Sequence, residues 1–310
     1  MATTQARLSP AALRGELARP PRSLWTDAWY QFTRHKLAMG GLAVIAFLSI
    51  ATLVGPFLWP TKMDAIDFSI AIEGPSPTHP FGTDDLGRDI FARALWGGRV
   101  SIAVGLTAVV IAITLGTSVG ALAGYFKRLD NPLMRLTDLF LSLPILPLLL
   151  IVIYLFRDKL RQMFGPEVGI FIMIVSVIGV LEWMPVARLV RAQFLSLKQK
   201  EFVEAARAVG DPDSRIIWRH ILPNVLSPVL VAATIGVGGA ILTESTLSFL
   251  GLGFPPDVPT WGRLLYDAGN FIEIAPHWVI FPGFLIFITV LSINYVGDGL
   301  RDALDPRKTG

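Results

Sequence analysis

The sequence predicts an all-α membrane protein that crosses the bilayer six times. Of its 310 residues, 53% are hydrophobic and only 16% are charged, and the mean hydropathy is +0.57. A soluble domain of this length usually carries about 25% charged residues. The apolar residues are also gathered into long runs separated by charged intervals, as in proteins that cross a membrane repeatedly.

Six segments are long and apolar enough to span a bilayer, because a spanning helix needs roughly 20 apolar residues. They cover residues 37–59, 100–126, 136–156, 168–190, 225–249 and 278–296. The second carries Gly116, Gly120 and Gly124, one glycine per turn on a single helix face. Such a stripe predicts that another helix approaches closely, although glycine is also common in membrane helices generally.

The positions of Lys and Arg predict the orientation, because cytoplasmic loops of membrane proteins are enriched in these residues. With the N-terminus inside, 19 of the 27 basic residues lie in cytoplasmic segments and 8 lie outside. Both termini are therefore expected in the cytoplasm. The cytoplasmic segments then include the tails 1–36 and 301–310 and the loop 191–223, while the connections 60–99 and 250–277 lie outside.

The first 36 residues do not read as a cleavable signal peptide, because their charges are scattered and no compact apolar core precedes a small-residue site. We expect a cytoplasmic tail with a short amphipathic helix over residues 24–32. There Trp25, Trp29 and Phe32 would share one face at the bilayer surface. The alternative is a tail that simply frays.

Several kinds of chemistry are excluded by composition. The chain has no cysteine, and its net charge of +3 is too small and too evenly spread to suggest a nucleic-acid surface. No Gly-Lys dipeptide occurs, so a phosphate-binding loop of the Walker type is impossible. The four histidines are far apart and lack metal-ligand spacing. We therefore expect no catalytic site and no metal site.

The interval 201–223 predicts two short helices joined by a tight bend. Its first part is rich in helix formers, and Gly210 stands where a left-handed helix end favours glycine. Asp211 suits an N-cap and Pro212 a first helical position, so a second helix should begin at once. Arg215 and Arg219 would align on it at i, i+4. A rigid, bent helical segment that is fixed at both ends to membrane helices is a structure on which a soluble motor protein could push. The alternative is a solvated helical hairpin between two spans.

The spacing of this interval resembles the EAA loop of ABC-importer permeases, with Glu-Ala-Ala at 204–206, a glycine four residues on, and Leu-Pro at 222–223. Over about residues 79–300 the chain is similar to the C-type subunit of the dipeptide, oligopeptide and nickel importer group. His220 departs from the isoleucine of the wider family. The similarity is carried by His79-Pro-Phe-Gly-Thr-Asp-Asp-Leu-Gly-Arg-Asp89, Glu201-Phe-Val-Glu-Ala-Ala-Arg-Ala-Val-Gly210, Arg219-His-Ile-Leu-Pro-Asn224 and Leu247-Ser-Phe-Leu-Gly-Leu-Gly253.

This resemblance implies a type I ABC importer permease fold, with a core over residues 100–300, in the plasma (inner) membrane of a prokaryote. It implies a second (B-type) permease, one or two ABC ATPases, a periplasmic or extracellular substrate-binding protein, and membrane lipid as partners. ATP and Mg would be bound by the ATPases, so this chain would need no cofactor. The residues expected to couple to the ATPase are Glu201, Glu204, Ala205, Ala206, Gly210, Asp211, Arg215, Arg219, Leu222 and Pro223.

Ionisable residues inside predicted spans are candidates for a transport pathway or for structural pairs. Glu182, followed by Trp183, would line the pathway, or Glu182 would pair with Arg188. Glu244 would line the substrate portal or hydrogen-bond a helix end. Asp138, near the start of its span, would have an interfacial role or a functional one.

The outside connections hold further candidate residues. Asp89 and Arg93 are spaced i, i+4 on an expected short amphipathic helix. The loop after Gly253 is expected to be polar and accessible, and to line an outer vestibule or contact the binding protein. The residues expected there are Asp257, Trp261, Arg263 and Tyr266.

The function that follows is a permease subunit of an ATP-driven, binding-protein-dependent importer, with peptides as the expected cargo. The alternatives are a secondary transporter, which would bind substrate at broken helices and use an ion gradient, and a membrane scaffold without transport activity. The sequence does not distinguish dipeptides, longer peptides, glutathione, haem and nickel as cargo.

Overall fold

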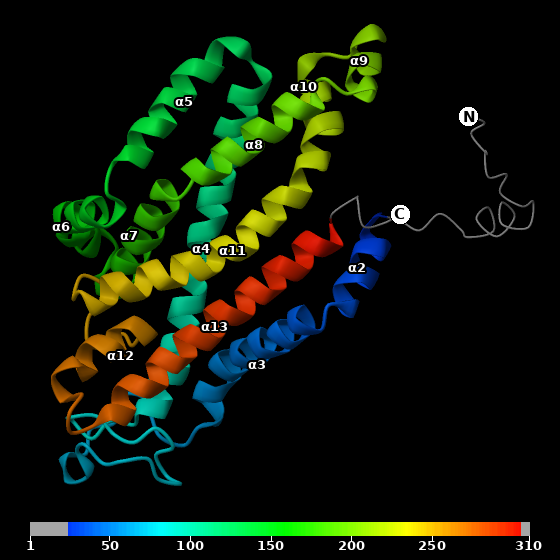
Figure 1. Ribbon diagram of the computed structural model, residues 1–310. Coiled ribbons are helices and arrows are strands. Elements are labelled where there is room, and N and C mark those ends of the chain that lie inside the picture. Colours follow the sequence, from blue (N-terminus) through cyan, green and yellow to red (C-terminus); the bar gives the residue numbers. More distant parts are fainter. Residues whose placement is uncertain (1–23, 305–310) are drawn as a thin grey trace, which may run out of the picture.

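The computed structural model describes residues 24–304, and this part of the chain is almost entirely helical (Figure 1). Within residues 24–304, four helices are long and apolar enough to span a membrane, and there are up to six spans if each of two bent pairs counts as one. The predicted all-α polytopic class is confirmed. The continuous spans are α3 (Lys36–Leu58), α4 (Ile90–Tyr125), α11 (Leu222–Phe249) and α13 (Pro276–Ala303).

The two bent pairs are joined by short breaks, and shorter elements connect the spans. The pairs are α5 (Lys127–Ser142) with α6 (Ile145–Phe164), and α7 (Pro166–Leu181) with α8 (Met184–Leu197). The shorter elements are α2 (Leu24–Arg34), η1 (Phe68–Ile70), α9 (Glu201–Ala208), α10 (Asp213–Arg215), the π-helix η2 (Ile216–Ile221), α12 (Trp261–Ala268) and η3 (Gly269–Phe271).

Helix α4 forms the centre of the bundle, because it packs against α3, α7, α8 and α11. Its glycine stripe faces α8. A Cβ atom on Gly120 would lie 2.5 Å from the carbonyl oxygen of Ala187, and one on Gly124 would lie 2.5 Å from the Cβ of Phe194. Only glycine permits this approach, so the predicted close packing on the stripe is confirmed.

Two predicted spans are not straight. The segment 136–156 is divided between α5 and α6, which meet at 89°, and the segment 168–190 is divided between α7 and α8, which meet at 41°. The first break follows from Pro144, which holds the preceding Leu143 in an extended conformation. In the second, Pro185 stands at the start of α8 and cannot donate a helical hydrogen bond to the carbonyl of Leu181.

The second span starts earlier than expected, at Ile90 and not at residue 100. Asp89 causes this early start, because its carboxylate accepts hydrogen bonds from the backbone N–H groups of Phe91, at 2.8 Å, and Ala92, at 3.3 Å. An N-cap of this kind stabilises the first helical turn. The helix consequently extends well outside the apolar stretch, toward the loop that precedes it.

Trp29 and Phe32 share one face of α2, as predicted, with ring centroids 5.9 Å apart, but the two side chains differ in burial. Phe32 is only 4% exposed and packs with Ala38, Val296 and Ala303, whereas Trp29 is 60% exposed. Phe32 therefore anchors α2 to α3 and α13 and does not face the bilayer. The side chain of Trp25, residues 1–23 and residues 305–310 lie outside what the structure describes.

The helical bundle has two distinct ends (Figure 1). Helices α9 and α10 lie at one end, beside the turn between α4 and α5. The segment 60–89 and helix α12 lie at the opposite end. Two candidate regions are therefore separated by the length of the bundle: the segment 201–223, called the coupling segment below, and the outer loops.

Candidate functional site

The first helix of the coupling segment ends in a Schellman motif. The backbone N–H of Gly210 donates to the carbonyl of Arg207, and that of Asp211 donates to the carbonyl of Ala206, both at 3.0 Å. Gly210 has φ of +90°, the left-handed conformation that this motif requires. The predicted glycine-terminated helix is confirmed, and α9 ends in a defined turn.

Asp211 does not cap the next helix, contrary to the sequence-based expectation. The N-cap of α10 is Pro212, with ψ of 153°, and its helix begins at Asp213. The Asp211 carboxylate instead accepts a hydrogen bond from Arg215 at 2.7 Å and lies 3.2 Å from Nε2 of His220. Hydrogen bonding from Arg215, and then from His220, lowers the pKa of Asp211. Asp211 thus fixes the bend by holding the two turns that follow it.

Residues 216–221 form a π-helix between α10 and α11. The predicted i, i+4 alignment of Arg215 with Arg219 is based on α-helical spacing, which does not apply in this stretch. Arg215 pairs back to Asp211, and Arg219 is exposed. Histidine at position 220, the departure from the wider pattern, here supplies the second contact to Asp211.

The coupling segment is packed firmly onto the bundle. Val203, Ile216 and Ile221 are fully buried, and they form one apolar cluster with Phe194 of α8 and Val225 of α11. These contacts tie α9 and the π-helix to the two helices that enter and leave the segment. A force applied to α9 would therefore be transmitted to α8 and α11 together.

The end of α4 also holds the coupling segment. The hydroxyl of Tyr125 donates a hydrogen bond to Asp213, and the guanidinium of Arg207 lies over the Tyr125 ring at 5.9 Å. Just before the segment, at the end of α8, the ammonium group of Lys198 donates to the carbonyl of Gly124 at 2.9 Å. Sequence reasoning missed these contacts, because Tyr125 lies far from the segment in the chain.

The exposed surface of the coupling segment combines charged, small and apolar side chains. Glu201, Glu204 and Ala205 are exposed and Ala206 is half-buried; among the remaining candidates Leu222 is half-buried and Pro223 exposed, at the first turn of α11. Three large apolar side chains that the sequence analysis did not single out are also exposed: Phe202 at 42%, Trp218 at 70% and Val209 at 86%. The sequence does contain a signal for these three residues, because they are large apolar residues within a charged interval.

Glu182 lies at the break between α7 and α8, beside the buried Trp183. Its carboxylate accepts a hydrogen bond of 3.1 Å from the hydroxyl of Thr243 on α11. The predicted pairing with Arg188 is wrong, because Arg188 is exposed and forms its ion pair with Asp138 of α5. Glu182 therefore links α7 to α11, and Arg188 links α8 to α5.

Glu244 is fully buried and faces other hydrogen-bonding side chains. It accepts a hydrogen bond of 3.0 Å from Ser101 and one of 2.7 Å from Ser248. The Ser101 oxygen in turn accepts one from the backbone N–H of Trp261, at the start of α12. This geometry agrees with the prediction that Glu244 hydrogen-bonds near a helix end. It does not agree with the alternative prediction that Glu244 lines an open portal.

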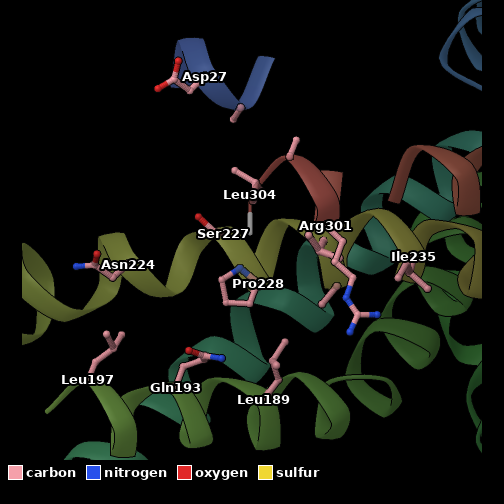
Figure 2. A pocket seen from close by; sticks show the side chains of 14 residues that line it. Asp27, Leu189, Gln193, Leu197, Asn224, Ser227, Pro228, Ile235, Arg301 and Leu304 are labelled. Carbon is pink, nitrogen blue, oxygen red and sulfur yellow. The ribbon is translucent and has the colours of Figure 1, made fainter. Parts of the chain in front are cut away.

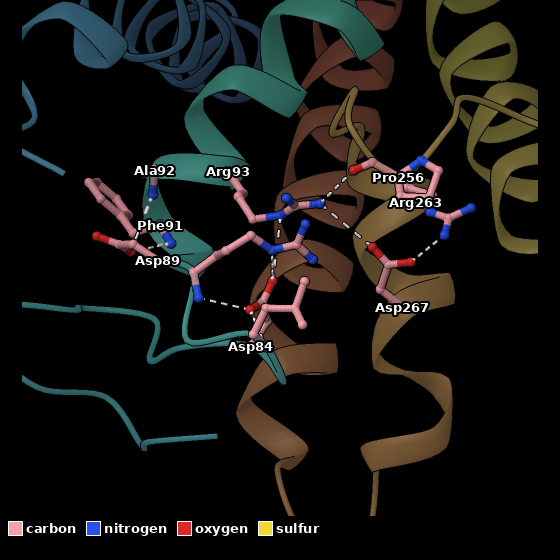
Figure 3. Close-up of polar contacts among 10 residues, drawn as sticks. Asp84, Asp89, Phe91, Ala92, Arg93, Pro256, Arg263 and Asp267 are labelled. Carbon is pink, nitrogen blue, oxygen red and sulfur yellow. Dashed lines mark hydrogen bonds and ion pairs between the residues drawn. The ribbon is translucent and has the colours of Figure 1, made fainter. Parts of the chain in front are cut away.

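The outer loops are joined to α4 by a buried ionic network (Figure 3). Arg93 lies 3.6 Å from Asp267 and 3.9 Å from Asp84, and donates a hydrogen bond of 3.2 Å to the carbonyl of Pro256. The i, i+4 spacing of Asp89 and Arg93 therefore does not make them an ion pair, and the expected short helix is the first part of α4. The Asp89 carboxylate caps α4, and it also accepts a 2.7 Å hydrogen bond from the indole N–H of Trp59.

Two of the four expected surface residues in the outer loop are not accessible. Trp261 is 0% exposed, with its indole N–H donating to the carbonyl of Ala94, and Arg263 is largely buried against Asp267 at 2.7 Å. Burial raises the pKa of Asp267, an effect opposed first by Arg263. Asp257 and Tyr266 are exposed. The error arose because a tryptophan and an arginine in a loop were taken to face water.

The fold is a helical bundle with membrane-spanning helices and a bent segment at one end, and the family to which it belongs is shown by comparison with known proteins. Residues 112–310 match the family described as binding-protein-dependent transport system inner membrane component, and residues 23–75 match the N-terminal membrane domain of oligopeptide transport permease C. The chain belongs to this family of inner-membrane transport components, and the family predicted from its motifs is confirmed.

Relatives in several bacteria are similar along nearly their whole length. The chain is 41% identical over 286 residues to the dipeptide transport system permease protein DppC of Alkalihalophilus pseudofirmus, covering 92% of this chain and 90% of the relative. It is 41% identical over 295 residues to the oligopeptide transport system permease protein OppC of Haemophilus influenzae, covering 94% and 91%. The glutathione transport system permease protein GsiD of Pectobacterium atrosepticum is 38% identical over 289 residues, with 92% of each chain covered.

A solved structure shows the same fold. A chain of the MetNI methionine ABC transporter in an inward-facing conformation superposes with a TM-score of 0.55 at 19% identity, covering 70% of this chain and 96% of that one. The chain therefore has the type I importer permease fold and acts as a membrane permease subunit of an importer. The alternatives of a secondary transporter and a passive scaffold are not favoured.

Proposed function

We propose that this permease forms half of an import pathway for short peptides and receives the work of ATP hydrolysis through its coupling segment. The observation that carries the proposal is the exposed face of this segment. Phe202, Val209 and Trp218 project from a backbone that is held by the Asp211 contacts and by the buried Val203 cluster. Exposed apolar side chains on a rigid support are typical of a protein interface.

The coupling works as the transfer of a rigid-body movement. Small side chains at Ala205 and Ala206 let a partner approach the α9 backbone, while Glu204 offers a charge beside them. Because the segment is packed onto α8, α11 and the end of α4, a movement of α9 would shift these helices together. The other proposed contact residues, from Glu201 to Pro223, surround this surface.

We further propose the partners that complete the transporter. They are a second permease, one or two ATPases that bind ATP and Mg, and a substrate-binding protein outside the membrane; this chain itself would bind no cofactor. The coupling segment and both termini would be cytoplasmic, in agreement with the 19 and 8 basic residues inside and outside. Asp257 and Tyr266, exposed at the opposite end, would contact the binding protein.

Short peptides are the cargo that the relatives have in common. Their names describe transport of dipeptides, oligopeptides and glutathione. All three are short amide-linked molecules with free charged groups. The break at Glu182 and Trp183 would lie along the pathway, because it separates two helix directions between α7 and α8.

Substitution of one exposed tryptophan tests the proposal. We expect Trp218→Ala to weaken co-purification of the ATPase and to abolish uptake by the assembled importer, while the subunit still accumulates in the membrane. Trp29→Ala is the matched control, because Trp29 is similarly exposed but lies on α2. Uptake driven by an ion gradient without any ATPase would refute the proposal, and so would equal behaviour of the two variants.

A further inference from the structure

A cavity of about 930 Å³ lies between α2, α8, α11 and α13 (Figure 2). Its size falls within the range of roughly 300–1,000 Å³ that is usual for sites of small ligands. Apolar side chains cover much of the wall, and polar ones are placed at separate points around it. The polar lining residues are Asp27, Gln193, Asn224, Ser227 and Arg301.

The polar side chains of this cavity retain unused hydrogen-bonding capacity. Within residues 24–304, the side chains of Asp27, Gln193, Ser227 and Arg301 form no hydrogen bond or ion pair with another protein group; the first three are half-buried and Arg301 is exposed. Pro228 adds a backbone acceptor, because it has no N–H to donate to the carbonyl of Asn224, one turn earlier in α11. Groups of this kind favour a polar ligand.

The two charged residues lie on different walls of the cavity. In Figure 2, Asp27 belongs to α2 on one side, and the guanidinium of Arg301 extends from α13 toward the space between α11 and α8. A single acid and a single base, separated by amide and hydroxyl groups, complement a zwitterion whose charged ends are separated by amides. A peptide of two or three residues has this arrangement, with a length of roughly 7–11 Å when extended.

The cavity is also placed where the coupling segment would change its shape. Gln193 and Leu197 lie on α8 just before the segment, and Asn224 and Ser227 lie on α11 just after it. Both walls are therefore attached to α9 and the π-helix through the buried cluster of Phe194, Val203 and Val225. A movement of the segment would change the spacing between α8 and α11, and with it the room available to a ligand.

We propose that this cavity is a transit site for short zwitterionic peptides, in which Arg301 binds the terminal carboxylate and Asp27 the terminal ammonium group. Gln193, Asn224 and Ser227 would hydrogen-bond the peptide amides between them. The inference rests on the proposed function, because it assumes that peptides pass through this subunit. Because α8 and α11 would move with the coupling segment, ATP hydrolysis by the partner could release the peptide after it has bound.

The absence of native cysteine allows a direct test in the intact importer. A Ser227→Cys subunit is assembled with its partners in phosphatidylcholine nanodiscs without nucleotide. The rate at which a water-soluble methanethiosulfonate reagent modifies it is then followed by mass spectrometry of this chain. Trialanine at ten times its half-protecting concentration should slow modification by about tenfold, since occupancy reduces the free site by a factor of one plus that ratio.

Blocked peptides and charge variants identify the contacts. Trialanine amide, which lacks the carboxylate, and acetyl-trialanine, which lacks the ammonium group, should each need about tenfold higher concentration or more. Arg301→Gln should remove the difference between trialanine and its amide, and Asp27→Asn the difference made by the acetyl group, as in a double-mutant cycle. Lys36→Gln removes an exposed charge that does not line the cavity, and should leave both differences unchanged.

Three outcomes would overturn the transit site. Equal protection by trialanine and by acetyl-trialanine amide would show that the charged ends are not recognised. A rate that changes with phosphatidylglycerol in the nanodisc but not with peptide would make the occupant a lipid. A thiol that cannot be modified in the complex would show that a partner subunit covers the cavity. ATP-dependent uptake and ATPase retention, measured on the same preparation, report separately on the proposed function.

Discussion

The substitution Gly210→Val tests whether the bend of the coupling segment is required for transport. With φ of +90°, Gly210 has a conformation that costs a β-branched residue roughly 1–2 kcal/mol. In the part of the chain that the structure describes, no heavy atom beyond the two adjacent residues lies within 4 Å of the position that a Cβ would occupy. The whole cost is therefore conformational, and no packing contact is lost. The bent form should be reduced relative to its alternatives by roughly 5–30-fold.

We expect the Gly210→Val subunit to insert and accumulate normally, because the substitution lies outside the packed bundle. In proteoliposomes containing the full importer, uptake per ATP hydrolysed should fall, with the ATPase bound weakly or hydrolysing without transport. Gly210→Asn should retain much more activity, since asparagine tolerates the left-handed region. Gly40→Val is the control, because Gly40 has equally open surroundings and no positive φ.

The ranking of the variants carries the test. If Gly210→Val couples hydrolysis to uptake as well as Gly40→Val does, the bend is not required and the segment is only a connector. If Gly210→Asn is as impaired as Gly210→Val, the defect comes from side-chain size at the interface and not from backbone conformation.

Three further predictions follow from the packing and the orientation. Gly120→Ala should lower the stability of the subunit by about 1–3 kcal/mol through overpacking. Gly239→Ala should have little effect, because within residues 24–304 no atom beyond the adjacent backbone of its own helix lies within 4 Å of its Cβ position. Thermal unfolding of the complex measures both variants, and equal melting temperatures would contradict the α4–α8 contact. Arg93→Met should destabilise the outer network by about 1–3 kcal/mol, because it removes one of the two arginines beside each buried carboxylate, while Arg88 still pairs with Asp84 and Arg263 with Asp267. Unchanged proteolysis of residues 60–89 would argue against this role. Reporters fused after residue 70 or 260 should lie outside, and those fused after residue 130, 210 or 310 should lie inside. An external signal from the fusion after residue 210 would contradict the proposed topology.

Local features of the chain were predictable without the structure. The apolar segments correspond to helices because burial of backbone groups in lipid leaves few alternatives, and the Schellman end of α9 was predictable because a positive φ selects glycine at the residue concerned. The glycine stripe of α4 was predictable for a similar reason, since its periodicity is a property of one helix. The family followed from short motifs whose spacing is read directly.

Pairings between distant segments could not be predicted in this way. Asp89 and Arg93 have the i, i+4 spacing of a helical ion pair, yet Asp89 caps α4, and Arg93 contacts Asp84 and Asp267. Arg188 was predicted as a partner of Glu182, whereas the bend between α7 and α8 turns Arg188 toward Asp138. In each case a nearby partner was chemically suitable, and a different one was closer in space.

The sequence by itself determined that this chain crosses a membrane with up to six spans and carries a glycine-ended helix between two of them, because hydropathy and turn chemistry act over a few residues at a time. Its resemblance to ABC-importer permeases, carried by short motifs, indicated the family. The tertiary structure decided which charges meet, that Trp261 is buried and Arg263 largely so, and that α2 lines a cavity together with α8, α11 and α13. These features depend on where proline breaks redirect whole helices and on which side chains then meet across the bundle. Such distances have no signature in the order of the residues.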